Sequence, residues 1–274
     1  LVNLMERHPV RVREEPSRYL VSLHNLLLAQ HTTRREKDFF SLIEKVKKMT
    51  YRDKKMQAMV FHASWVLEFS TYTDWRRFEE GKRLIPKITE GLNHHDAYLR
   101  VNWKVFDYHN LAHTCFALGN FTEALDWSNK IINTKETFHN NIRSLARIMG
   151  LLIHYELGNW ELLEYMVRSV QRYLGKQGHL YKTEKLLLQY FRKKLLQDAN
   201  PQQLKESFNA LRAELILLMQ GDPLEKQLLE LFDLPAWVDS KLQKRSYSEL
   251  ARAHYLNRLS EKAGAPVVKT KSTK

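Results

Sequence analysis

Two segments of this sequence, residues 22–43 and 107–128, align with each other without a gap. Each carries His-Asn-Leu, beginning at His24 and at His109, within a stretch whose apolar residues recur at helical spacing. A polar turn follows, and then a second stretch with the same spacing. Self-similarity of this kind indicates a repeat, so each copy is predicted to be a helix-turn-helix hairpin.

Further copies of the turn lie in "STYTDWRRFEE" and "ELGNWELLEYMV". We place equivalent turns at four positions that are 39, 46 and 39 residues apart: Arg34, Thr73, Gly119 and Gly158. An aromatic residue stands two positions after three of them: Trp75, Phe121 and Trp160. This regular phase predicts packing between helices. A fifth hairpin is expected around Asn200, which can cap a helix that starts at Pro201, and its register is left open.

Composition favours helices throughout the chain. Only 9 glycines and 7 prolines occur in 274 residues, and strong helix formers dominate. Because one amphipathic hairpin cannot bury its own apolar stripe, stacking of neighbours is required. We therefore predict an all-α protein, an α-solenoid of about five hairpins with a concave surface. The first residue is Leu, so we expect a piece of a longer protein.

Three regions are expected along the chain. Residues 1–221 form the repeat array, residues 222–262 form C-terminal capping helices, and residues 263–274 form a basic disordered tail. Asp222 with Pro223, and Ser246 with Glu249, suit the starts of two of the capping helices. The apolar stretch "LLELFDLPAWV" fits either a cap on the solenoid end or a homodimer contact.

The stretch "YHNLAHTCFALGNFTEALDW" resembles the tetratricopeptide repeat (TPR). The resemblance rests on a small set of positions: Asn110, Leu111, Ala112, Gly119, Phe121 and Ala124. It extends over roughly residues 17–220, with larger residues at the position of Ala124 in the other copies: Phe39, Phe78 and Leu163. The spacings also exceed the family's period of about 34 residues.

The resemblance implies that the solenoid is right-handed and that it is a binding module rather than an enzyme. Similar asparagines in TPR proteins face the groove and hydrogen-bond an extended peptide, because an amide offers both donors and an acceptor. The expected contacts to a peptide segment or partner helix are five: His24, Asn25, His109, Asn110 and His113. The alternative is that both asparagines tie neighbouring helices together.

His109 and His113 stand one helical turn apart, as in a zinc peptidase helix. Asn110 occupies the place of the general base, and an amide cannot accept the proton. Cys115, the single cysteine, is expected to be a small buried hydrophobe. Nucleotide-binding and hydrolase motifs are absent from the sequence, so we expect no metal, no cofactor and no catalysis.

The net charge of +13 is uneven, since residues 241–274 carry nine Lys or Arg against two Glu. This end supports a second hypothesis, salt-sensitive binding to nucleic-acid phosphates. The candidate contacts are five: Lys241, Lys244, Arg245, Arg252 and Arg258. The alternative is a solubilising end. Apolar runs are too short to span a membrane, so we expect a soluble, cytoplasmic scaffold.

Overall fold

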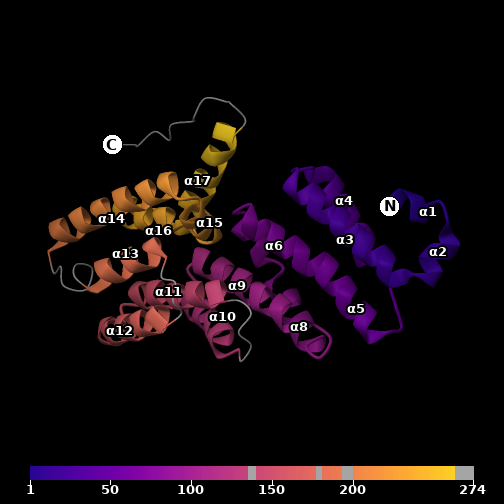
Figure 1. Cartoon of the computed structure of the whole chain (residues 1–274), viewed down its shortest axis with the longest axis horizontal. Coiled ribbons are helices and arrows are strands. Elements are labelled where there is room, and N and C mark those ends of the chain that lie inside the picture. The colour runs from indigo at the N-terminus through magenta and orange to yellow at the C-terminus, as the bar shows by residue number, and fades with distance from the viewer. Residues whose placement is uncertain (135–139, 177–180, 193–199, 263–274) are drawn as a thin grey trace. The chain divides into compact units, whose positions relative to one another are not determined.

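The computed structural model describes residues 1–134, 140–176, 181–192 and 200–262, and every regular element in these ranges is a helix (Figure 1). The all-α prediction is therefore confirmed. The chain divides into two compact units, Leu1–Asn110 (unit 1) and Leu111–Lys274 (unit 2). Residues 263–274, the expected disordered tail, lie outside the described ranges. No described helix is long and apolar enough to cross a membrane.

Unit 1 holds the helices before α9 and the start of α9 itself. Their bounds are α1 Val2–Glu6, α2 Pro9–Glu14, α3 Pro16–Thr32, α4 Glu36–Lys47, α5 Lys54–Phe61, the π-helix η1 His62–Val66, α6 Leu67–Asp74, α7 Phe78–Lys82, α8 Ile85–His94 and α9 Val101–Ala117. The segments α5, η1 and α6 follow one another without a break.

Unit 2 holds the rest of α9 and the helices that follow. Their bounds are α10 Phe121–Asn133, α11 Asn140–Glu156, α12 Trp160–Lys176, α13 Lys182–Tyr190, α14 Pro201–Gly221, α15 Pro223–Leu231, α16 Leu234–Gln243 and α17 Tyr247–Lys262. Within this unit α10 packs on α11, α11 on α12, and α16 on both α14 and α17.

Four helices end in the same left-handed turn. Their residues with positive φ are Arg34, Arg76, Gly119 and Gly158, at 56°, 56°, 77° and 71°, and Lys244 at the end of α16 also has a positive φ, of 54°. In each of the four turns the next N–H donates to the carbonyl five positions earlier, over 2.7 to 3.0 Å: Arg35 to Gln30, Arg77 to Tyr72, Asn120 to Cys115 and Asn159 to His154. This is the Schellman pattern of a helix C-terminus.

The second turn therefore centres on Arg76, and its placement at Thr73 was wrong. The corrected spacings are 42, 43 and 39 residues. Phe78, rather than Trp75, is the aromatic residue two positions after this turn, and Gly81 rather than Phe78 matches the small Ala124. Trp75 instead packs in unit 1, with its ring stacked 5.6 Å from that of His31. The turn was misplaced because it was located from Trp75, and no glycine marks the residue with positive φ, which here is an arginine.

Replacing glycine with alanine should change stability in opposite directions at two positions, one in a left-handed turn and one within a helix. Gly119 has φ of +77° and Gly175 lies in α12, and at both an added Cβ would meet no other atom within 4 Å. Gly119→Ala should destabilise the fold by about 1 kcal/mol, since an L-residue is strained in the left-handed region. Gly175→Ala should stabilise it by about 0.5 kcal/mol through reduced chain entropy. Urea denaturation of both variants checks this, and equal signs would contradict it.

Caps in the C-terminal part follow the sequence closely. The side chains of Asn200 and Asp222 accept hydrogen bonds from the N–H groups of Gln202 and Leu224, as predicted. Ser246 and Glu249 form the predicted capping box, with both side-chain to backbone contacts at 3.3 Å. These contacts satisfy N–H groups that a helix start leaves without partners.

Candidate functional site

The helix α3 carries two of the predicted peptide contacts. Asn25 is exposed, and Val21 and Leu28 lie beside it with 47% and 41% of their surface accessible. The three residues are spaced by four and three positions, so they share one helix face. We call this exposed surface the α3 face. His24 is half-buried, and its pKa is lowered by burial and by the nearby His62.

His62 begins the π-helical segment and joins two elements of unit 1. Its ring stacks on Trp103 at 4.4 Å, and its Nε2 lies 3.5 Å from Oδ2 of Asp107. Asp107 is only 3% exposed. Burial raises the pKa of Asp107, while His62 acts in the opposite direction. π-helical segments are often found at functional sites, but nothing in the sequence marked His62 or Asp107.

Asn110 joins two neighbouring helices, which was the alternative to a peptide contact. Its side-chain nitrogen donates to the hydroxyl of Ser70 in α6 over 2.9 Å. His109, its neighbour, is buried. Asn110 therefore ties α9 to α6 within unit 1, and any peptide contact by its amide would compete with this bond.

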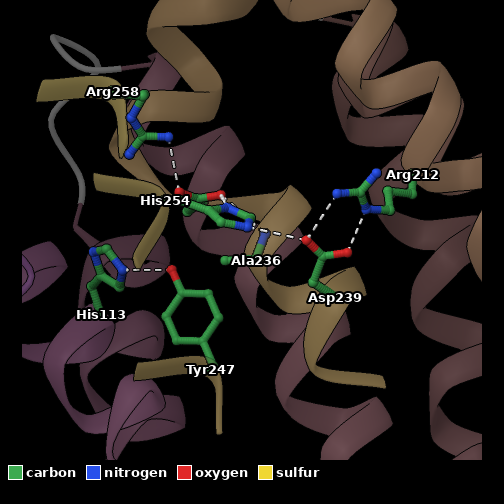
Figure 2. A network of polar contacts seen from close by, with 8 residues as sticks. His113, Arg212, Ala236, Asp239, Tyr247, His254 and Arg258 are labelled. Atoms are coloured by element: carbon green, nitrogen blue, oxygen red, sulfur yellow. Dashed lines mark hydrogen bonds and ion pairs between the residues drawn. The ribbon is translucent and has the colours of Figure 1, made fainter. Parts of the chain in front are cut away.

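His113 lies inside unit 2, where 1% of its surface is accessible. Its Nε2 is 2.9 Å from the hydroxyl of Tyr247 (Figure 2). Its ring also packs 5.0 Å from that of Phe232. The contact with Tyr247 connects α9 to α17 across 134 residues of sequence. Of the five predicted contacts, Asn25 thus offers the most accessible side chain, and the peptide role of all five stays a prediction.

The predicted nucleic-acid contacts largely have acidic neighbours. Lys241 pairs with Glu156, Arg258 Nη1 lies 3.0 Å from Asp233, and Arg245 Nε lies 3.8 Å from Glu249. Arg252 lies over the ring of Tyr255, at 5.5 Å from its centroid. Lys244 is exposed at the left-handed C-terminus of α16. Internal pairing lowers the charge that these residues offer to phosphates, and their binding role stays a prediction.

Two buried carboxylates organise the C-terminal helices (Figure 2). His254 of α17 places Nδ1 3.2 Å from Asp233 and Nε2 3.1 Å from Asp239. Burial opposes the charge of His254, but hydrogen bonds to both carboxylates outweigh it and raise its pKa to about 9. Arg258 contacts Asp233, and Arg212 contacts Asp239 through two nitrogens. We call these five residues the C-terminal ion network.

Two findings concern the potential metal ligands and the thiol of the described residues. No three His, Cys, Asp or Glu side chains in the described ranges are arranged to hold a metal ion. Cys115 is buried, as predicted, and burial raises the pKa of its thiol, so the reactive thiolate is disfavoured. No protein-family model, curated protein or solved structure matches this chain.

Proposed function

We propose that this chain is a non-catalytic, TPR-like binding module. Its hairpins stack as a right-handed α-solenoid, and the first helix of each hairpin faces a peptide segment or partner helix. The observation that carries the proposal is the α3 face, where the exposed amide of Asn25 lies between two exposed aliphatic side chains. The four like turns support a common hairpin unit.

The α3 face has the chemistry that peptide recognition needs. Val21 and Leu28 offer apolar surface to side chains of a partner, and burial of that surface is favourable. The amide of Asn25 can donate to one peptide carbonyl and accept from one peptide N–H. Asn25 has the position of Asn110 in the aligned segments, but it is exposed whereas Asn110 is half-buried.

The test is peptide selection with the full chain, followed by comparison of variants. Peptides are selected from a random displayed library, and their affinities are measured by fluorescence polarisation. Val21→Lys with Leu28→Lys should weaken binding at least tenfold, and Asn25→Ala about fivefold, because each removes a contact at the α3 face.

The matched control places the same change elsewhere. Leu217 and Leu224 in unit 2 are 66% and 64% exposed, so Leu217→Lys with Leu224→Lys adds the same charge and removes similar apolar surface. This pair should leave affinity unchanged. Equal weakening by both pairs, or no weakening by the α3 pair, would exclude the α3 face as the binding surface.

A further inference from the structure

Unit 1 contains a cavity of about 430 Å³ that none of the predicted contacts lines. It lies between α8, the helix formed by α5 and η1, and the connection from α4 to α5. Its walls combine three aromatic rings with Lys87, two histidines and one carboxylate: Tyr51, Phe61, Trp65, Lys87, His94, His95 and Glu90. Its size falls in the range typical of small-molecule sites.

Gly91 allows the close packing that shapes one wall. A Cβ at this position would lie 2.1 Å from the ring of Phe61, so only glycine lets the ring lie against α8. The same ring lies 5.2 Å from that of His95. Gln57, four residues before Phe61 on α5, also lines the cavity, and its Nε2 donates to the carbonyl of Tyr51 over 2.8 Å, which holds the connection in place. The cavity is therefore formed by packed groups before any ligand arrives.

The charge around the cavity favours an anion. Lys87 is exposed. Its ammonium lies 3.4 Å from the carboxylate of Glu90, and because both groups are exposed, this ion pair holds the ammonium only weakly. Four exposed basic residues, against one exposed acid, Asp53, lie within three positions of the lining residues in α5 and in the connection before it: Lys48, Arg52, Lys54 and Lys55. Such a cluster raises the local concentration of anions.

A cationic ligand fits less well, although aromatic walls can attract one. The ammonium of Lys47 already lies over the ring of Trp65, at 4.1 Å from the centroid. A second cation at this face of the ring would have to displace Lys47, which Glu44 and Glu68 hold at 2.8 and 2.7 Å.

We propose that this cavity binds a small anion that carries an aromatic ring. The ring packs against Phe61 and Trp65, and the anionic group meets Lys87 and His94 at the rim. The site is separate from the α3 face, so loss of either function leaves the other intact.

Calorimetric titration of the full chain tests the proposal with four probes: adenosine monophosphate, phenyl phosphate, adenosine and inorganic phosphate. We expect saturable binding of the two aromatic phosphates, and at least tenfold weaker binding of adenosine and of inorganic phosphate, because each lacks one of the two groups. Equal affinities for all four probes, or no binding of the aromatic phosphates at millimolar concentration, would overturn it.

Variants at the rim locate the site. Lys87→Gln with His94→Gln should weaken binding of adenosine monophosphate at least tenfold, and since both side chains are exposed the fold should persist. Lys82→Gln, an exposed change on α7 that removes a similar charge outside the cavity, is the control. Unchanged affinity in the rim variant, or an equal loss in the control, would also overturn the proposal.

Discussion

Replacing His254 with glutamine should destabilise unit 2 by about 3 kcal/mol at pH 6.5, and by far less above pH 9.5. At the lower pH the imidazolium lies between two carboxylates that are almost fully buried. Removing one partner of a buried ion pair is costly because an uncompensated charge remains. Such a removal typically costs about 3 to 5 kcal/mol. Arg258 and Arg212 still contact the carboxylates, so the loss should lie at the low end of this range.

The pH dependence follows from the direction of the pKa shift. Hydrogen bonds to Asp233 and Asp239 raise the pKa of His254 to about 9, against about 6.5 in an unfolded chain. The folded state therefore binds a proton more tightly than the unfolded state. Its stabilising contribution is fully present below about pH 6.5 and is lost as the pH rises through about 9.

Urea denaturation followed by circular dichroism, at several pH values from 6 to 10, measures this effect. The difference in unfolding free energy between the wild type and His254→Gln should shrink as the pH rises. His8→Gln, which removes an exposed histidine in unit 1, is the control and should change little. A difference that stays constant with pH would show that His254 is not charged in the folded protein.

Replacing Trp237 with alanine should cost about 4 kcal/mol, the largest effect of any single truncation considered. Trp237 is fully buried, and its ring lies 5.6, 6.3 and 5.7 Å from three others, those of Tyr155, Phe191 and Phe208. Its Nε1 also donates to Glu156 over 2.7 Å. The variant loses packing and leaves a cavity among these rings.

Trp160 provides the matched control, because it is 51% exposed and packs against the same Tyr155 at 5.1 Å. Trp160→Ala should cost less than about 1 kcal/mol, since much of its ring already meets water. Both variants are compared by thermal unfolding and by urea denaturation. A similar cost for the two would contradict the central place of Trp237 in the core of unit 2.

Short-range features could be predicted from the sequence. Asn200, Asp222 and the pair Ser246 with Glu249 cap helices within three residues of themselves, so the local sequence is sufficient. The helical class also followed from composition and spacing. The turn at Arg76 was missed because its left-handed backbone is set by hydrogen bonds between main-chain groups, which any residue type can make.

Long-range pairings could not be predicted in this way. His113 finds Tyr247 across 134 residues, and Asn110 finds Ser70 across 40. No local pattern distinguishes a histidine that faces a groove from one that contacts a distant helix. The C-terminal ion network was missed for the same reason, since Asp233 and His254 each look like ordinary polar residues of a helix start and a helix face.

The π-helical segment His62–Val66 has a geometric consequence for the helix that contains it. A π-helical turn adds one residue to the ladder, which in an α-helix corresponds to about 100° of rotation. Side chains before and after the segment therefore follow different angular phases. Phe61 can line the cavity beside α8 while Ser70, nine residues on, meets α9. Over these nine residues a regular α-helix would turn by about 900°, and the inserted residue lowers this to about 800°, so the two side chains point about 80° rather than about 180° apart.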